Sequence, residues 1–144
     1  MKRTVANFYY FIAFQNGITF LLGGYTNDDR SVHLFNNEKW INLKPFDRSL
    51  IFGCATFIPK NDSKVYILGG LSNMNLHRNV WKYDLENKSY EKLNTKMPAP
   101  KNGLKSLACV GIRTELNKEV IQIGDLSKAH QALQTFFAKV RVPG

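Results

Sequence analysis

Residues 64–70 read KVYILGG, an apolar and β-prone run that ends in two glycines. The same pattern occurs 46 residues earlier, where residues 18–24 read ITFLLGG. A third run, EVIQIG at residues 119–124, brings its glycine 55 residues after Gly69. Self-similarity at a period of roughly 20 to 50 residues is the mark of repeat proteins. The chain is therefore predicted to consist of tandem copies of one structural unit.

Another apolar stretch precedes each of these runs. Cys54 lies 15 residues before Gly69, and Cys109 lies 15 residues before Gly124, so the cysteines take matching places in the repeat. In the first copy, the two apolar stretches are joined by an Asn-Gly pair at residues 16–17. Such a pair accepts positive φ and is typical of a β-hairpin. The first two strands of a unit are therefore expected to form a hairpin.

Two more segments follow the glycines. Residues 32–36, VHLFN, match residues 80–84, VWKYD, and an aromatic residue then opens the next strand at Trp40 and Tyr90. Proline comes soon after, as at Pro45, where it removes a backbone donor and ends the strand. Each unit thus reads as four short strands joined by turns, which is the pattern of a propeller blade.

The repeat resembles that of the kelch family over about residues 7–125. The marks of that family are an apolar run closing in a double glycine, then a Tyr-Asp pair, then a Trp-type aromatic. In this sequence they are residues 23–24 with Phe35, Asn36 and Trp40, and residues 69–70 with Tyr83, Asp84 and Tyr90. Phe35-Asn36, Tyr90 and Asp125, which stands for the second glycine of the third copy, depart from the pattern. The resemblance implies that Trp40 and Tyr90 pack near the glycines of their own blades.

The predicted fold is all-β: a partial kelch-type β-propeller of about 2.5 four-stranded antiparallel blades, with a short C-terminal helix. The kelch region is placed at 1–125, with blade 1 at about 7–46, blade 2 at about 50–96 and a partial blade 3 at about 104–125. Residues 126–144 are predicted to be an amphipathic helical tail, because their apolar residues recur at roughly helical spacing.

Two and a half blades cannot close a ring, since propellers hold roughly four to eight blades. The sequence therefore leaves three outcomes open. The chain is a fragment or degenerate short version of a longer propeller, which is the favoured outcome; it associates with itself through open blade edges; or its tail and first strand cover the ends.

Function is expected in the loops, because the links after the second and fourth strands of a meander emerge on one side. Arginine and tyrosine are favoured at binding hot spots. The predicted partner-binding residues on that side are Tyr25, Asp29, Arg30, Arg48, His77, Arg78 and Lys101. The resemblance implies a non-enzymatic protein-interaction scaffold, with a protein partner of the cytoskeletal or ubiquitin-ligase-substrate type.

Signs of enzyme chemistry are weak in the sequence. His33, His77 and His130 lie far apart, and no metal-ligand spacing or nucleophile elbow occurs. No catalytic residue, metal or cofactor is therefore predicted. One alternative is a propeller fragment of a carbohydrate-active enzyme of the oxidase or sugar isomerase type. A third class, a basic module for an anionic polymer, rests on the net charge of +9 alone, and the scattered basic residues do not favour nucleic acid.

The cysteines are expected to be buried free thiols, because a disulfide framework would need more of them. A reducing, cytoplasmic setting follows from that expectation. The start of the chain faintly resembles a signal peptide, but its apolar run breaks at residues 15–17. No stretch of eighteen apolar residues occurs, so no membrane span is expected.

Overall fold

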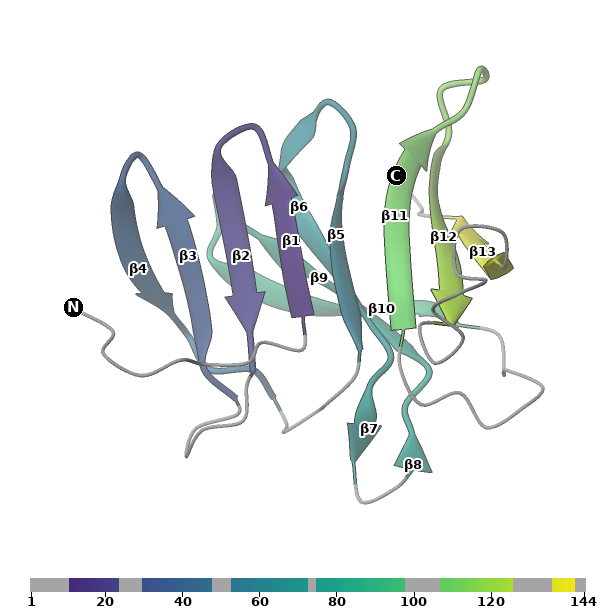
Figure 1. Ribbon diagram of the computed structural model, residues 1–144, viewed down its shortest axis with the longest axis horizontal. Coiled ribbons are helices and arrows are strands. Elements are labelled where there is room, and N and C mark those ends of the chain that lie inside the picture. Colours follow the sequence, from purple (N-terminus) through teal and green to yellow (C-terminus); the bar gives the residue numbers. More distant parts are fainter. Residues whose placement is uncertain are drawn as a thin grey trace.

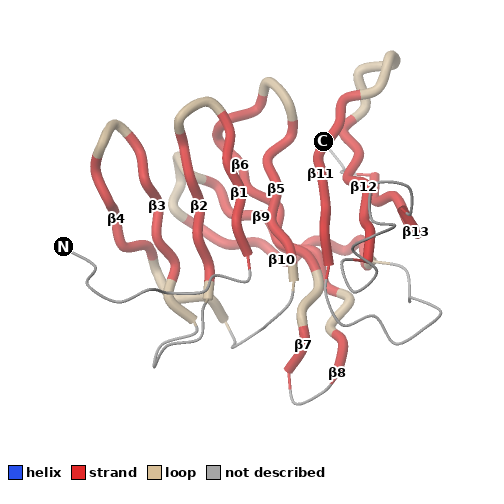
Figure 2. The backbone as a smooth tube through the Cα atoms, viewed as in Figure 1, coloured by secondary structure: helices blue, strands red, loops and turns tan. Residues whose placement is uncertain are grey.

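The protein is described here by a computed structural model, which describes residues 11–23, 30–47, 53–72, 75–97, 107–125 and 136–141. Within those residues every regular element is a β-strand (Figure 2). No helix that could span a membrane occurs in these ranges. The strands form three sheets and one small hairpin (Figure 1).

The first sheet, blade 1, is a four-stranded antiparallel meander in which each strand pairs with the next. It contains β1 (Phe11–Gln15), β2 (Ile18–Leu22), β3 (Val32–Asn36) and β4 (Lys39–Leu43).

The second sheet, blade 2, has the same antiparallel order and carries an inserted hairpin. Its strands are β5 (Cys54–Ile58), β6 (Asn61–Leu68), β9 (Asn79–Asp84) and β10 (Ser89–Lys96). The hairpin of β7 (Leu71–Ser72) and β8 (Asn75–Leu76) lies between β6 and β9 in the chain. The third sheet, blade 3, contains β11 (Leu107–Arg113), β12 (Glu119–Asp125) and β13 (Phe136–Arg141).

The three blades stack side by side through their first strands, as Figure 1 shows for β1, β5 and β11. All residues of β5 are buried, because this strand is covered by β1 on one side and by β11 on the other. The approach is close enough to require glycine. A Cβ added at Gly53 would collide with the Phe11 ring, and one at Gly111 would collide with the Phe57 carbonyl oxygen.

Two apolar clusters fill the spaces between blades. The first joins blades 1 and 2 and contains Phe11, Phe20, Leu22, Val32, Phe46, Phe57, Val65, Ile67 and Tyr83 among others. The second joins blades 2 and 3 and contains Cys54, Ile58, Tyr66, Leu68, Val80, Met97, Ile121 and Ile123. A blade that cannot bury its faces alone is thus buried by its neighbours, as the repeat pattern predicts.

The turn chemistry is confirmed. Asn16 and Gly17 have φ of 50° and 79°, as an Asn-Gly hairpin turn requires. At the ends of β2 and β6, Gly23, Gly69 and Gly70 also have positive φ, which explains why the apolar runs close in glycine.

The aromatic residues of the repeat take equivalent places, although not beside the glycines. Trp40 lies opposite Phe35, and Phe35 lies opposite Thr19, at the other end of the sheet from Gly23. The ring of Trp40 packs on that of Phe35, with centroids 4.9 Å apart. In blade 2 the rings of Tyr90 and Tyr83 lie 4.7 Å apart in the same positions.

The prediction of free thiols is wrong, because Cys54 and Cys109 form a disulfide between β5 and β11, with Cα atoms 5.9 Å apart. Equal spacing from the glycines predicted equivalent positions, whose side chains would point the same way. Strand pairing confirms the equivalence, since Cys54 pairs with Leu68 and Cys109 with Ile123. The difference lies in the face that is used: Leu68 and Ile123 both belong to the cluster between blades 2 and 3, so equivalent faces of these two blades meet and bring the two sulfurs together. The disulfide also removes the argument for a reducing compartment, because disulfides persist in oxidising ones.

The predicted C-terminal helix is not found at residues 136–141, which form β13 and pair with β12. The remainder of the predicted tail lies outside the described residues. The sequence FFAKVR is apolar at alternate positions as well as at helical spacing, and short runs of this kind fit either structure. The edge of β12 that does not pair with β11 offers backbone hydrogen-bonding groups, and pairing with them favours a strand over a helix for these residues.

Candidate binding face

The links after the second and fourth strands emerge at one end of the stacked blades, as the antiparallel order requires. We call this end the loop face. Its described parts in blades 1 and 2 include Gly23, residues 30–31, residues 44–47, residues 69–72 and 75–78, and residues 96–97. The β7–β8 hairpin projects from this end (Figure 1). The tight turns inside each hairpin lie at the opposite end, which we call the turn face.

Two arginines hold the loop face together by the same pair of hydrogen bonds. In blade 1, Phe46 N donates to Arg30 O at 2.9 Å, and Arg30 Nε donates to Phe46 O at 2.7 Å. In blade 2, Met97 N donates to Arg78 O at 2.8 Å, and Arg78 Nε donates to Met97 O at 2.7 Å. We call each set an arginine latch. It ties the link that leaves the fourth strand to the start of the third strand.

Each latch positions an apolar side chain that enters the next blade. Phe46 is fully buried, and its ring meets those of Trp81 and Tyr90 edge-on at 5.2 and 5.5 Å. Met97 is also fully buried and belongs to the cluster between blades 2 and 3. Tyr90 adds a hydrogen bond from its hydroxyl to Lys44 O at 2.7 Å, and burial raises its pKa. Packing between blades therefore fixes the backbone from which the loops depart.

The structure describes some of the residues predicted to bind a partner. Arg30 and Arg78 are exposed on the loop face, and each directs Nε into its latch. His77 is half-buried beside the β7–β8 hairpin, and its backbone N donates to Gly70 O at 2.9 Å. Arg30, His77 and Arg78 thus share one face. The remaining candidates, Tyr25, Asp29, Arg48 and Lys101, lie outside the described residues.

Sequence reasoning missed Phe46 and Met97, the residues on which the geometry of this face depends. A signal was present, because each is an isolated apolar residue next to a proline, at Pro45 and Pro98, in an otherwise polar link. An apolar side chain in a polar link is often buried against a neighbouring element. Arg30 and Arg78 also occupy matching positions before the third strand of each blade, which indicates a shared structural role.

The two ends of the blades differ in charge. On the loop face of blades 1 and 2, the described charged residues are Arg30, Lys44, Asp47, Arg78 and Lys96, so cations dominate. On the turn face of the same blades, acids and bases alternate and balance. They are Glu38, Lys39, Lys60, Asp62, Lys64, Asp84, Glu86 and Lys88. Among the described residues of these two ends, the excess of positive charge therefore lies on the loop face.

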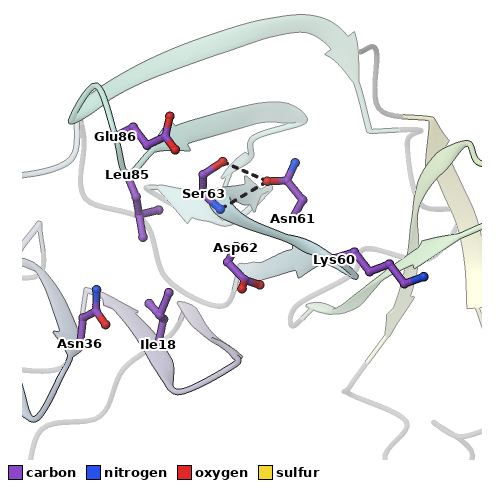
Figure 3. Close-up of a pocket in the computed structure, with 8 residues that line it drawn as sticks. All are labelled: Ile18, Asn36, Lys60, Asn61, Asp62, Ser63, Leu85 and Glu86. Atoms are coloured by element: carbon purple, nitrogen blue, oxygen red, sulfur yellow. Dashed lines mark hydrogen bonds between the residues drawn. The ribbon is translucent and has the colours of Figure 1, made fainter.

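A shallow pocket of about 430 Å³ lies on the turn face between blades 1 and 2 (Figure 3). It is lined by Ile18, Asn36, Lys60, Asn61, Asp62, Ser63, Leu85 and Glu86. Asp62 is already engaged, because Gln15 Nε2 and Asn16 Nδ2 donate to its two carboxylate oxygens at 2.7 and 2.8 Å. These bonds, first from Asn16 and then from Gln15, lower the pKa of Asp62. The polar groups here serve the contact between blades.

Among the described residues, no group of three or more His, Cys, Asp or Glu side chains is placed to hold a metal ion. His33 is buried in β3, and its Nδ1 lies 2.7 Å from Asn42 Oδ1.

Comparison with known proteins agrees with this architecture. The kelch motif matches residues 61–97, which run from the start of β6 to the latched residue Met97. No curated protein matches the chain in sequence. A solved structure titled "Structure of YjhT" is similar in fold, with a TM-score of 0.57 and 18% sequence identity. The match covers 85% of this chain and 36% of that one, so the chain spans about a third of the length of this neighbour. The resemblance seen in the sequence is thus confirmed for the second blade, which carries a kelch motif, and the fold resembles that of the solved neighbour.

Proposed function

We propose that this protein is an interaction scaffold that binds a protein partner through the loop face. The observation that carries the proposal is the arginine latch, which occurs in both blades and holds the roots of the loops against a buried Phe46 or Met97. A rigid scaffold that presents variable loops is a common basis for recognition. Kelch motifs in general mediate protein interactions, which supports the same function.

The charge of the loop face defines the chemistry of the partner. Because described cations dominate there, the partner presents an acidic surface to Lys44, Lys96 and the arginines. Rim charges of this kind mainly steer association and set its dependence on salt. A cytoskeletal protein or a ubiquitin-ligase substrate with an acidic patch is the class proposed. A cytoplasmic location belongs to this proposal and requires the blades to stay folded when the disulfide is reduced.

The test is charge reversal on one face at a time. Lys44→Glu with Lys96→Glu changes two exposed residues of the loop face, and Lys60→Glu with Lys88→Glu is the matched control on the turn face. Proteins cross-linked to each variant in cell extract are quantified by mass spectrometry. We expect the specific partner to be lost only from the loop-face variant, with a far-UV spectrum equal to that of the wild type. Equal losses from both variants would indicate non-specific attraction, and no loss from either would reject the loop face.

A further inference from the structure

The inner strands of blades 2 and 3, β5 and β11, lie side by side and are tied together at several levels (Figure 1). At the end nearest the loop face, the disulfide joins Cys54 to Cys109. Two residues further along each strand, Gly111 N donates to Thr56 Oγ1 at 3.0 Å. Reduction can break the first of these ties, whereas the second does not respond to reductant.

A further tie lies at the turn face. Arg113 donates to Pro59 O from Nε at 3.2 Å and from Nη2 at 3.0 Å. Its guanidinium also forms an ion pair with Glu119 at 2.9 Å within blade 3, and both side chains are partly buried. Arg113 therefore reaches the β5–β6 turn of blade 2 from a fixed position. The turn-face end of this junction does not depend on the disulfide.

The disulfide is continuous with a row of buried side chains that crosses blade 2. Cys54 pairs with Leu68, and Leu68 pairs with Val80. These three side chains belong to the cluster between blades 2 and 3, so they point toward blade 3. Val80 stands two residues after Arg78, which holds Met97 in the latch of blade 2. The row therefore leads from the disulfide to that latch.

Only one of the two latches shares its apolar cluster with the disulfide. Met97 belongs to the cluster of Cys54, and so does Ile123, which pairs with Cys109. Phe46, the latched residue of blade 1, packs instead in the cluster between blades 1 and 2. The sheet of blade 2 separates the two clusters. The blade 1 latch is therefore an internal reference for the blade 2 latch.

The disulfide is accessible to a small thiol from one side. Cys54 is 7% exposed, whereas Cys109 is only partly buried, so an incoming thiolate attacks Cys109 Sγ. The attack forms a mixed disulfide at Cys109 and releases Cys54 as a thiolate, which takes up a proton. A second small thiol attacks the sulfur of the first and frees Cys109. Two small thiols are then oxidised to one disulfide, and both cysteines are reduced.

We propose that this disulfide is a redox switch for the loop face. Reduction by a thiol of the glutathione class loosens the loop-face end of the junction between blades 2 and 3 and releases the latch of blade 2, while the turn-face end stays closed. Two thiols need more room than the bonded sulfurs that they replace, and a close-packed interior has little to spare. The proposal concerns one junction and does not depend on whether further blades adjoin those described. Its consequence for partner binding rests on the proposed function, but the switch is tested without a partner, so either can fail alone.

Hydrogen exchange of backbone amides, followed by NMR on the full chain, reports on each part of the junction. The probes are Met97 N, which donates to Arg78 O, Phe46 N, which donates to Arg30 O, and Gly111 N. Reduction with glutathione should speed exchange at Met97 N at least about 10-fold relative to Phe46 N. The rate at Gly111 N relative to Phe46 N should stay the same. A general loss of stability would speed exchange at these amides equally, so the ratios isolate local opening.

Two variants of β5 make a matched pair. Cys54→Ser should show the higher ratio of Met97 N to Phe46 N with and without glutathione. Thr56→Val removes the neighbouring tie but keeps the disulfide, so the oxidised variant should keep the ratio of the oxidised wild type. Reduction of the wild type itself needs no variant, and reoxidation with glutathione disulfide should restore the first ratio.

The outcomes separate a switch from a purely structural disulfide. A higher ratio of Met97 N to Phe46 N in the reduced chain, with Gly111 N unchanged, supports the proposal. A ratio that stays the same or falls means that the disulfide stabilises the fold without controlling the latch, and overturns the proposal. An equal rise at Gly111 N means that blades 2 and 3 separate along the whole junction, which also overturns it.

Discussion

In blade 2, Trp81 and Tyr90 pack edge-on against Phe46 from the preceding blade, whereas Trp40 at the corresponding place in blade 1 is 48% exposed. The two blades have the same strand order and the same aromatic pair on the third and fourth strands. Among the described residues, the difference is that Phe46 from another blade enters the aromatic site of blade 2, whereas no described ring from another blade enters that of blade 1. Burial of the aromatic pair therefore depends on the link that reaches it from the neighbouring blade.

The largest difference should appear when the ring that joins the two blades is removed. Phe46→Ala leaves a cavity between Trp81 and Tyr90, and should lower the free energy of unfolding by about 3 to 5 kcal/mol. Trp40→Ala should lower it by about 1 kcal/mol or less, since the ring is half exposed. Urea unfolding followed by circular dichroism gives both values. Equal losses would mean that the two aromatic sites are equally buried.

Reduction of the disulfide, which joins blades 2 and 3, should give the next largest loss of stability. Cys54 and Cys109 are 55 residues apart, and closing a loop of that size stabilises a protein by about 2 to 4 kcal/mol. Reduction should therefore lower the free energy of unfolding by this amount. Cys54→Ser should respond no further to reductant. If reduction leaves the wild type unchanged, the two inner strands are not joined as described.

The arginine latches should give smaller effects, and equal ones. Arg78→Ala and Arg30→Ala each remove a hydrogen bond to a buried link and should cost about 1 to 2 kcal/mol. Arg78→Lys restores the charge but not the geometry of Nε, so it should recover only part of the loss. The measurement is again urea unfolding. Full recovery with lysine would show that charge, rather than the paired hydrogen bonds, stabilises the link.

The smallest effect depends on pH and lies at the turn face. Hydrogen bonds from Asn16 and Gln15 hold the pKa of Asp62 below its ordinary value of 3.8. Because the pKa is lower in the folded state, the carboxylate stabilises the fold fully above that value, and this stabilisation is lost as pH falls through the folded pKa. The free energy of unfolding should therefore fall less between about pH 5 and pH 3 in Asp62→Asn than in the wild type. If the free energy of unfolding depended on pH identically in the wild type and in Asp62→Asn, Asp62 would not stabilise the contact between blades.

Much of this fold could be read from the residues themselves, because its elements follow local rules. The Asn16-Gly17 turn and the positive φ at Gly23 and Gly69 depend only on glycine and asparagine chemistry. The disulfide could not be predicted, because it depends on which face of blade 3 packs against blade 2, and the repeat pattern does not determine that face. Nor could β13, whose sequence fits a helix until the edge of β12 is available.

The loop face likewise combines features that the sequence predicts with features that it does not. That the loops share one face follows from antiparallel order alone, so Arg30, His77 and Arg78 were found together. The latches could not be predicted, because they pair Arg30 with Phe46 and Arg78 with Met97 across a whole hairpin. Contacts of that kind are set by three-dimensional packing and leave only a faint trace in the spacing of the sequence.

Nuclear Overhauser effects between aromatic rings test the central claim most directly, which is that each link carries a side chain into the receiving face of the following blade. Cross-peaks are expected from the Trp81 indole to the ring of Phe46, because the two ring centroids lie 5.2 Å apart. Phe46 is at the same time predicted to contact Tyr90. A Trp81 indole without any cross-peak to Phe46, in a folded sample with both rings assigned, would contradict the stacking of the blades.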